Sequence, residues 1–573
     1  MNLTKSLLAF VVIVWVSAAC QRALPGVTLH QYAPQKSAVS ASSMVVTPHA
    51  LATRAGLEVL EQGGNAVDAS IAVHFAMAVV FPRAGNLGGG GFMVIRLKNG
   101  ETDALDYREK APATAHRDMY LDSLGNVIKG LSTDGHLAAG TPGTVAGLIA
   151  AHQKYGKLDF KKLLAPAIRL AEAGFPVSGA EADRLNSFQS AFRKFNTPPN
   201  PFLRENWKAG DILVQKELAR TLRLIQDKGK SGFYSGETAR EIVAEMQSGG
   251  GMVTLDDLKK YEAKWRKPLT GRYKEYKIIS MPPSSSGGVA LLQLLEMVEP
   301  YPLSQWGFQS KEAVHLMAEA SRRVYADRSQ YLGDSDFFPV PMDSLLNERY
   351  LLKRMADFNP AKATSSEAVG AGNFKVALES FETEHTSVVD AEGNAVSVTT
   401  TLNSNYGCKV WVDGAGFFLN NEMDDFSVKP GVPNQFGLVG AEANAIQPYK
   451  RMLSSMTPTI VEKNGNLFMV LGTPGGSTII TTVFQVFINV AEFGMDLEKA
   501  VNSGRFHHQW LPDLIMTERG AFNPATRSVL ESMGHRFQEV DRIAVIKAIL
   551  KLPDGRLNGV GDFRNPDDDA RGN

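Results

Sequence analysis

The order of apolar and polar positions predicts helices through the first two thirds of the chain and short strands after residue 383. Met44-Val-Val-Thr47 has the apolar, β-branched character of a strand. Two helices follow, over residues 49–62 and 66–80, where Gly63-Gly64 can end the first and Asn65 can cap the second. The second helix is apolar on every side, which predicts that it is buried.

The later segments extend this mixed pattern to the end of the chain. Residues 145–355 are mostly helical, with amphipathic stretches such as 160–173 and 236–245. No period of about 20 to 50 residues recurs, which excludes a repeat architecture. Further strands are predicted at 92–97, 386–390, 395–402, 409–412, 457–462 and 467–471, and further helices at 478–492 and 523–533. This layout predicts a mixed α and β fold with antiparallel hairpins.

Residues 1–19 have the features of an export signal. Lys5 supplies positive charge, and an apolar run from Leu7 to Val16 precedes small residues. The run is too short to span a bilayer well. Ser17-Ala18-Ala19-Cys20 resembles a bacterial lipoprotein cleavage site, so lipid anchoring through Cys20 and simple secretion both remain open. We expect an exported protein, periplasmic or on the outer surface, with residues 20–42 as a tether.

Charge and cysteine content narrow the classes of function. The 573 residues include 60 basic and 60 acidic side chains and carry a formal net charge of +0. Without a basic stripe, nucleic acid is not an expected partner. If Cys20 is removed or lipidated, Cys408 stands alone and no intrachain disulfide can form. Cys408 is not expected to be catalytic, because no base lies nearby in the sequence and a strand is predicted directly after it.

Three motifs that suggest chemistry are better explained by structure. The glycine run 88–91 lacks the flanking residues of a phosphate loop, so we expect tight backbone packing there. His507 and His508 are adjacent and point apart, and no ligand spacing accompanies them. Residues 284–288 form a predicted loop without the GxSxG pattern of a serine hydrolase. No metal or organic cofactor is implied.

Residues 383–477 concentrate small polar side chains in several short motifs. Together they supply a hydroxyl nucleophile, carboxylates, paired serines and a glycine pair, although each motif alone could form turns and caps. The motifs are Thr383-Glu-His-Thr-Ser387, Thr399-Thr-Thr-Leu-Asn403, Leu419-Asn-Asn-Glu-Met-Asp-Asp-Phe426, Arg451-Met-Leu-Ser-Ser-Met-Thr-Pro458 and Gly472-Thr-Pro-Gly-Gly-Ser477.

These motifs resemble the γ-glutamyltranspeptidases, and the resemblance covers nearly the whole chain after residue 42. Upstream and downstream it includes Gly64-Asn-Ala-Val-Asp-Ala69, Leu105-Asp-Tyr-Arg-Glu109, Ala139-Gly-Thr-Pro-Gly143 and Arg505-Phe-His-His-Gln-Trp510. The resemblance implies an α+β fold, the αββα four-layer sandwich of N-terminal-nucleophile hydrolases. It also implies a precursor that cuts itself into a large subunit, 43–382, and a small subunit, 383–573, which remain together.

The resemblance assigns Thr383 as the nucleophile and the Glu382–Thr383 bond as the cleavage site. A threonine hydroxyl needs a base, and the amine that cleavage exposes can serve as one. With a reference pKa of about 7.7–8.0, much of that amine is neutral near physiological pH. Thr401 matches a threonine that hydrogen-bonds the nucleophile's hydroxyl. The alternative is that both threonines are ordinary strand residues.

Further matches imply a site for the amino acid end of the substrate. Arg108 and the pair Ser454 and Ser455 match residues that hold its α-carboxylate. Asn403, Glu422 and Asp425 match residues that hold its α-ammonium, while Asp424 is left out. Gly475 and Gly476 match an oxyanion hole built from backbone N–H groups, and residues 429–441 match a loop that covers the pocket. The alternatives are a structural ion pair for Arg108 and turn chemistry for the others.

The implied activity is that of a self-processing γ-glutamyltransferase and glutathione hydrolase. Its γ-glutamyl group would pass from glutathione or a related amide to Thr383, and then to water, an amino acid or a peptide. One rival is a related acylase for glutaryl side chains of β-lactams, which does not need Asn403, Glu422 and Asp425. A second rival is an inactive lipoprotein that binds γ-glutamyl compounds, which does not need Thr383.

Overall fold

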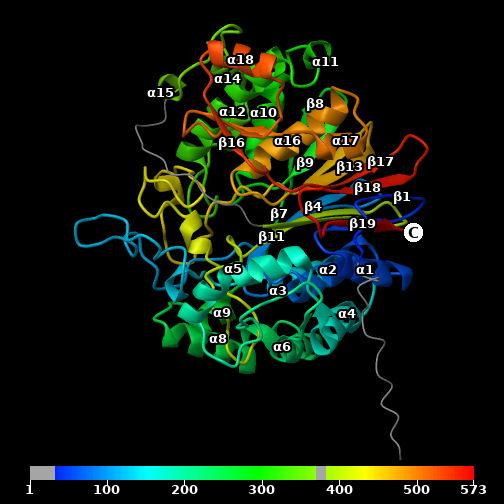
Figure 1. Ribbon diagram of the computed structural model, residues 1–573, viewed down its shortest axis with the longest axis vertical. Coiled ribbons are helices and arrows are strands. Elements are labelled where there is room, and N and C mark those ends of the chain that lie inside the picture. The colour runs from blue at the N-terminus through cyan, green and yellow to red at the C-terminus, as the bar shows by residue number, and fades with distance from the viewer. Residues whose placement is uncertain (1–32, 370–382) are drawn as a thin grey trace, which may run out of the picture.

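Two seven-stranded antiparallel sheets stack face to face between two layers of helices (Figure 1). The computed structural model describes residues 33–369 and 383–573. The export signal, Cys20 and Glu382 therefore lie outside the described residues. The predicted αββα four-layer sandwich is confirmed.

Both sheets combine strands from before and after Thr383. The first sheet has the order β1 (Ser37–Ser40), β18 (Leu557–Gly561), β17 (Lys547–Lys551), β13 (Asn466–Gly472), β12 (Thr459–Lys463), β9 (Tyr276–Ser280) and β8 (Leu269–Tyr273). The second has the order β19 (Asp569–Gly572), β2 (Met44–Thr47), β10 (Glu384–Val389), β11 (Ala395–Thr401), β3 (Gly90–Arg96), β4 (Thr102–Asp106) and β7 (Lys264–Arg266). Small sheets are formed by β14 (Phe506–His507), β15 (Ile515–Glu518) and β16 (Phe537–Val540), and by β5 (Phe175–Pro176) with β6 (Ile212–Leu213). The two pieces expected from cleavage would therefore share each large sheet.

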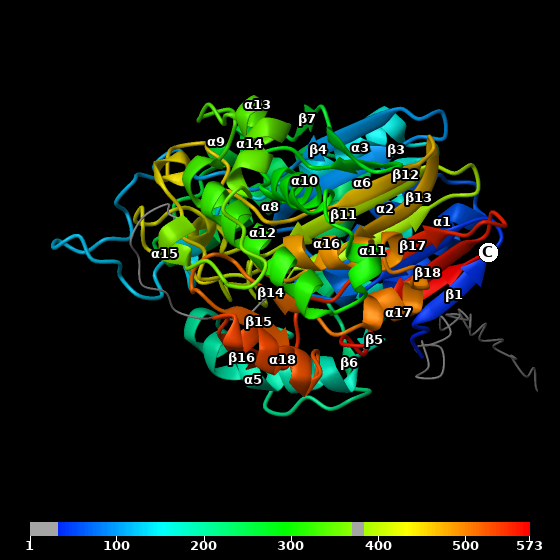
Figure 2. The ribbon, with the colours of Figure 1, turned by 90° about the horizontal axis from the view of Figure 1, so that it is seen from above.

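The helices divide between the outer faces of the two large sheets (Figures 1 and 2). The second sheet is covered by α1 (Ala50–Glu61), α2 (Ala66–Val80) and α3 (Thr144–Tyr155), with α4 (Phe160–Ala173) and α6 (Lys216–Lys228) behind them. The first sheet is covered by α10 (Gly287–Val298), α16 (Thr478–Ala491) and α17 (Leu497–Asn502), with α12 (Lys311–Tyr331) packed on α10. The other helices are α5 (Gly179–Phe195), α7 (Ser231–Tyr234), α8 (Gly236–Ser248), α9 (Leu255–Lys260), α11 (Leu303–Trp306), α13 (Met342–Leu345), α14 (Glu348–Arg354), α15 (Ser366–Val369) and α18 (Pro524–Ser532).

The alternation of side chains along β2 places them in two different hydrophobic cores. In β2, Val45 packs into the core beneath α1 and α2, whereas Met44 and Val46 pack into the core between the sheets. Successive side chains of a strand point to opposite faces, and here both faces are covered. The strand therefore reads as a continuous apolar run rather than an alternating one.

Several predicted boundaries are confirmed at the start of the chain. Strand β2 has the predicted bounds, and α2 begins after Asn65, whose side chain accepts from the Asp68 N–H in a capping box. The predicted tether, however, is wrong at its end, because Ser37–Ser40 pairs with β18. A polar edge strand next to a buried one leaves little apolar pattern to detect.

Two other predictions need correction. Residues 409–412 are not a strand, because Tyr406, Gly407 and Lys409 all have positive φ and the chain turns repeatedly there. The helical middle also contains β7, β8 and β9. Strands β17 to β19, at the carboxyl end, were not predicted. Strands β17 and β18 form a hairpin with each other, and their other partners, like that of β19, come from distant parts of the sequence.

The glycine run 88–91 packs against backbone, as predicted. A Cβ on Gly89 would lie 2.0 Å from the Thr401 carbonyl oxygen, and one on Gly91 would lie 2.4 Å from that of Thr399. Real Cβ atoms cannot approach so closely, so only glycine lets β3 and its preceding loop lie against β11. The run thereby fixes the position of the strand that ends at Thr401.

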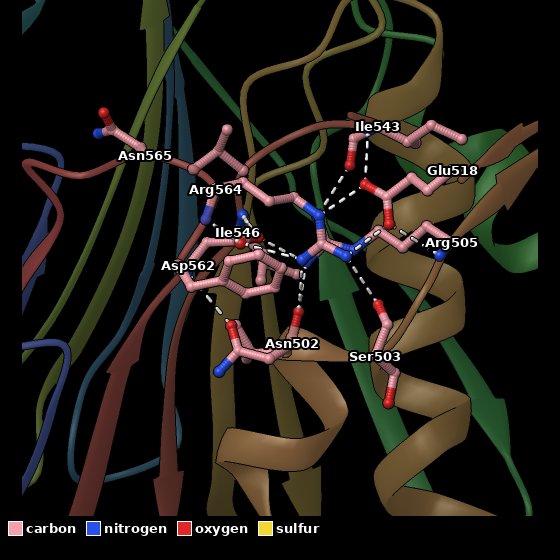
Figure 3. A network of polar contacts seen from close by, with 12 residues as sticks. Asn502, Ser503, Arg505, Glu518, Ile543, Ile546, Asp562, Arg564 and Asn565 are labelled. Carbon is pink, nitrogen blue, oxygen red and sulfur yellow. Dashed lines mark hydrogen bonds and ion pairs between the residues drawn. The ribbon is translucent and has the colours of Figure 1, made fainter. Parts of the chain in front are cut away.

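A buried ionic network ties the carboxyl-terminal strands to the loop before β17 (Figure 3). Arg505 binds the Asp562 carboxylate at 2.6 Å and donates to the Ile543 carbonyl at 2.8 Å. Glu518 accepts from the Ile543 N–H at 2.8 Å and also pairs with Arg564 at 2.5 Å. The network therefore anchors Ile543, next to Ala544, whose Cβ would lie 2.9 Å from a Cβ on Gly475.

Candidate functional site

Thr383 lies at the open end of the β10–β11 hairpin. Glu384 pairs with Thr400 in the antiparallel register, so one further step sets Thr383 opposite Thr401. Cβ atoms of directly opposed residues lie about 4.5–5.5 Å apart, within reach of a hydrogen bond between hydroxyl groups. Both threonines line the same pocket, and Thr383 is 7% exposed. Thr383 and Thr401 therefore lie side by side, as expected.

The two threonine hydroxyl groups have different partners. Thr401 Oγ1 accepts a hydrogen bond from the Asn403 N–H at 2.7 Å. Because an amide N–H can only donate, the hydroxyl hydrogen of Thr401 is left to donate elsewhere. Among the residues that the structure describes, none forms a hydrogen bond with the Thr383 hydroxyl. Thr401 can therefore donate to Thr383, as its proposed role requires.

Gly475 and Gly476 connect β13 to α16. Their φ angles of +145° and +53° lie in the region that favours glycine, and a Cβ on Gly475 would lie 2.7 Å from Thr478 Oγ1. Neither N–H donates to a described residue, and both precede α16, at the positive end of its helix dipole. Gly476 lines the pocket, and Gly475 lines a neighbouring cavity that also includes Thr383. This geometry suits an oxyanion hole.

Arg108 lines the pocket and is bound by three carboxylates. Its Nη1 lies 2.6 Å from Glu422 and 3.4 Å from Glu109, and its Nη2 binds Asp425. The ion pairs that the sequence left open as an alternative are thus formed. Glu422 is fully buried and contacts Arg108 from outside the pocket, whereas Asp425 lines the pocket.

Burial changes the protonation of this acidic cluster. It raises the pKa of Glu109 to about 8, and it raises the pKa of Glu422 and of Asp425 although Arg108 opposes the shift. An additional cation would therefore stabilise the ionised form of these carboxyl groups. A bound ammonium group beside Asp425 would supply one.

Asn403 and the loop 429–441 complete this side of the pocket. The Asn403 amide donates to the Asn421 carbonyl at 3.1 Å, and its Oδ1 accepts from no residue that the structure describes. Asp424, by contrast, accepts from Ser132 at 2.6 Å and from the Gln435 N–H at 2.9 Å, away from the pocket. The loop contributes five lining residues, as expected of a cover: Asn434, Phe436, Leu438, Val439 and Gly440.

Ser454 and Ser455 also line the pocket, and they contact Arg328, which the sequence did not single out, and Ser286, from the predicted loop at 284–288. Arg328, on α12, donates to Ser455, and Ser286, in the loop before α10, donates to the Ser454 carbonyl. Arg328 lies inside a segment with ordinary helical periodicity, so only the fold brings it here. The loop predicted at 284–288 is present and buried up to Ser286, whereas Gly287 and Gly288 already belong to α10.

Glu384, the residue after Thr383, is buried on β10 close to His74 of α2. His74 Nε2 lies 3.7 Å from its carboxylate, and neither carboxylate oxygen accepts a hydrogen bond from a described residue. Burial raises the pKa of Glu384 to about 8, although Lys547 opposes the shift. Below that pH Glu384 is a neutral acid, which is compatible with its burial.

Side chains elsewhere that could bind a metal ion are already bound by other side chains. Within the described ranges, one cluster could hold a metal ion: His315, Glu319 and His535. Glu319 is already bound to Arg322 and Arg323, and the two histidines share a hydrogen bond of 2.7 Å. Two arginines and a short N···N contact argue against a cation there.

Cys408 is buried and does not line this pocket. Burial raises the pKa of the Cys408 thiol to about 12, so it carries little thiolate at neutral pH, in line with the expectation that it is not catalytic. Among the residues placed by the structure, no helix is both long and apolar enough to cross a membrane.

Comparison with known proteins connects this geometry to one family. The profile of the family described as Gamma-glutamyltranspeptidase matches residues 52–571. The chain is 48% identical to the Glutathione hydrolase proenzyme of Escherichia coli (strain K12), over 92% of this chain and 91% of that protein. It is 33% identical to the Acylase ACY 1 proenzyme of Pseudomonas sp. (strain V22), over 92% of this chain and 93% of that protein.

Solved structures show the same relationships. A gamma-glutamyltranspeptidase of Helicobacter pylori is 47% identical, with a TM-score of 0.55, and covers 56% of this chain and 94% of its own. A cephalosporin acylase from Bacillus halodurans has a TM-score of 0.80 over 96% of this chain and 98% of its own. At 24% identity, the acylase shows a shared fold alone.

Proposed function

The chain belongs to the gamma-glutamyltranspeptidase family, and we propose that it is a self-processing γ-glutamyltransferase and glutathione hydrolase with Thr383 as its nucleophile. One observation carries the assignment of the site. The pocket that Thr383 and Thr401 line is also lined by Arg108, Asp425 and both serines of the 454–455 pair. A hydroxyl nucleophile therefore faces groups of both charges, as an amino acid end requires.

Maturation creates the base that Thr383 needs. The Thr383 hydroxyl attacks the Glu382 carbonyl carbon, and the peptide nitrogen leaves as the free amine of Thr383. The Glu382 acyl group is then held as an ester on Thr383, and water hydrolyses that ester. The result is a large subunit ending at Glu382 and a small subunit beginning at Thr383, held together by the two shared sheets.

Turnover uses the new amine and the glycine pair. The amine accepts the hydroxyl proton of Thr383 while the oxygen attacks the γ-carbonyl carbon of the donor. The negative oxygen that develops lies against the free N–H groups of Gly475 and Gly476. The donor's amine takes the proton and leaves, which forms a γ-glutamyl ester on Thr383. Water or the amine of an amino acid or peptide then removes the group.

Recognition of the donor follows from the charges of the pocket. Asp425 and the Asn403 Oδ1 offer acceptors for an ammonium group, and Glu422 adds negative charge behind Arg108. Arg108, Ser454 and Ser455 offer donors for the α-carboxylate. A glutaryl group has no ammonium, so the acidic cluster favours γ-glutamyl donors over the glutaryl side chains of the acylase rival.

We also propose that the protein is exported by residues 1–19 and is periplasmic or on the outer surface. The choice between a lipid anchor at Cys20 and free secretion follows from the mass of the mature amino-terminal peptide. A diacylglyceryl cysteine supports the anchor, and an unmodified terminus supports secretion.

A trapping experiment tests the proposed nucleophile. The purified enzyme is mixed with γ-glutamyl-p-nitroanilide, quenched in acid and digested, and the peptides are analysed by mass spectrometry. We expect the mass of one γ-glutamyl group on the peptide that begins at Thr383. A γ-glutamyl group on another peptide, or none during steady turnover, contradicts the assignment.

A further inference from the structure

Arg328 is a buried arginine in the pocket with no carboxylate partner. It lies near the end of α12, is 4% exposed and lines the pocket with Thr383. Within the described residues it forms no ion pair, whereas Arg108 in the same pocket contacts three carboxylates. A buried charge without a partner is costly, so its retention points to a ligand that completes it.

The Arg328 guanidinium joins the segment of Ser454 and Ser455 to the loop before α10. Its Nη2 donates to Ser455 Oγ at 3.0 Å, and its Nε donates to Ser286 Oγ at 2.9 Å. Ser286 Oγ in turn donates to the Ser454 carbonyl at 2.6 Å. Arg328 therefore holds Ser454 and Ser455 in place through two separate contacts.

The direction of these hydrogen bonds leaves both serines ready to donate. A guanidinium has donors only, so Ser455 Oγ must accept from Arg328 and keeps its own hydrogen. Ser454 Oγ likewise accepts from the Met456 N–H at 3.1 Å. Neither hydroxyl donates to any residue in the described ranges, and both serines line the pocket. Two O–H groups are therefore available to an anion.

The two arginines of the pocket differ in their charged partners. Arg108 lies among Glu109, Glu422 and Asp425, so more acidic than basic groups gather around it. Arg328 contacts two serine hydroxyl groups and forms no ion pair among the described residues. An amino acid end, with an ammonium and a carboxylate on one carbon, can therefore meet an acidic group in Asp425 and an uncompensated positive charge in Arg328.

We propose that Arg328 is a positioning residue for the donor's α-carboxylate: it directs the Ser454 and Ser455 hydroxyl groups into the pocket and supplies the positive charge behind them. The inference rests on the proposed function and makes it more specific. Arg108 is then held mainly by the acidic cluster, and it shares the recognition of the carboxylate with Ser454, Ser455 and Arg328.

Three p-nitroanilides separate the two ends of the donor. The γ-glutamyl compound has both charged groups, the 4-aminobutanoyl compound lacks the carboxylate, and the glutaryl compound lacks the ammonium. Release of p-nitroaniline is measured with Arg328→Met, at enzyme concentrations high enough to follow the weaker donors. We expect kcat/KM for the γ-glutamyl compound to fall about 10- to 100-fold, mainly through KM, because a charge-assisted contact is lost.

The 4-aminobutanoyl compound is the internal control. Its kcat/KM should not change in Arg328→Met, while the glutaryl compound should lose activity as the γ-glutamyl compound does. An equal loss for all three donors, or no loss for the γ-glutamyl compound, overturns the inference. If the wild-type enzyme releases no p-nitroaniline from the γ-glutamyl compound, the proposed function fails instead.

Two further variants protect the test against a folding defect. Self-cleavage and thermal unfolding report whether Arg328→Met is folded. If it is not, Arg328→Lys carries the test, because lysine keeps the charge but cannot bond Ser286 and Ser455 together. We expect a smaller fall in the ratio of γ-glutamyl to 4-aminobutanoyl activity, and an unchanged ratio overturns the inference. Arg354→Met, which removes an arginine bound to Asp327 at 3.1 Å outside the pocket, should leave the ratio unchanged.

Discussion

Thr383 lies across the hairpin from Thr401, one position beyond the last paired residues of β10 and β11. The Thr401 hydroxyl accepts from the Asn403 N–H and keeps its hydrogen for Thr383. A residue that would otherwise be an unremarkable strand threonine is thus placed where its hydroxyl can be held by a donor. In the proposed mechanism, cleavage frees the amine of Thr383, which then supplies the base that the hydroxyl needs.

Two replacements of Thr383 test whether its hydroxyl group is needed for self-cleavage and for turnover. Thr383→Ala should abolish both self-cleavage and turnover, because both reactions use the same oxygen. Thr383→Ser should retain cleavage at a reduced rate, since serine keeps the hydroxyl but loses the β-branch that limits χ1. Gel analysis of the two pieces and p-nitroaniline release measure the two effects. A Thr383→Ala protein that still cleaves would contradict the shared role.

Asp425 should matter for donor binding rather than for cleavage. Asp425→Asn removes the negative charge that faces the pocket, so kcat/KM for γ-glutamyl-p-nitroanilide should fall about 10- to 100-fold. Self-cleavage and activity on glutaryl-p-nitroanilide should be spared, because neither involves the ammonium group. Asp424→Asn is the matched control, since Asp424 binds Ser132 outside the pocket. Equal losses in cleavage and turnover would mean that Asp425 has another role.

Gly475→Ala tests the oxyanion hole. Its φ of +145° is strained for alanine, and the added Cβ would lie 2.7 Å from Thr478 Oγ1. The loop must shift, which moves the N–H groups away from the developing oxyanion. We expect kcat to fall by about 100-fold or more with KM less affected. Gly465→Ala, at a turn with φ of +78° and open space around it, controls for strain alone. Comparable losses in the two variants would argue against an oxyanion hole at Gly475.

Glu384 should make stability depend on pH. In the folded protein burial raises the pKa of Glu384 to about 8, from an ordinary value of 4.5, so the unfolded chain loses this proton first as pH rises. The contribution of Glu384 is therefore most favourable below pH 4.5 and declines by about 1.4 kcal/mol per pH unit up to about pH 8.

Denaturant unfolding at several pH values measures this contribution. Glu384→Gln should remove the part of the decline in the free energy of unfolding that Glu384 causes between pH 5 and pH 8. The variant should therefore be more stable than the wild type near pH 8. Glu392→Gln, at the exposed tip of the same hairpin, is the control and should leave the profile unchanged. The assignment fails if the Glu384→Gln profile keeps the slope of the wild type.

Local patterns predicted the early elements well, since their signals are contained in the sequence around them. The Asn65 cap and the apolar run after it fix α2, and Met44 to Thr47 fix β2. Strand β19 was not predicted, because its partner β2 lies near the other end of the chain. The turn at Lys409 was missed because positive φ at a lysine leaves no mark in the composition.

The residues of the site also differ in whether the sequence could identify them. Thr383, Asp425 and the serine pair stand in motifs that resemble a known family, so they could be named from sequence. Arg328 comes from a helical segment with no distinctive pattern, and Ser286 comes from a stretch interpreted as a plain loop. Only the contacts of Arg328 with Ser455 and with Ser286 identify them. Glu422 was expected to hold the ammonium group; it does not itself line the pocket and lies 2.6 Å from Arg108, which does.

The central claim is that Thr383 becomes an amino terminus and acts as the nucleophile from there. Amino-terminal sequencing of the smaller fragment of the purified, active protein tests it most directly. The account predicts a fragment that begins with Thr383-Glu-His-Thr-Ser and is absent from Thr383→Ala. A fragment with another first residue, or a chain that stays whole while fully active, would contradict it.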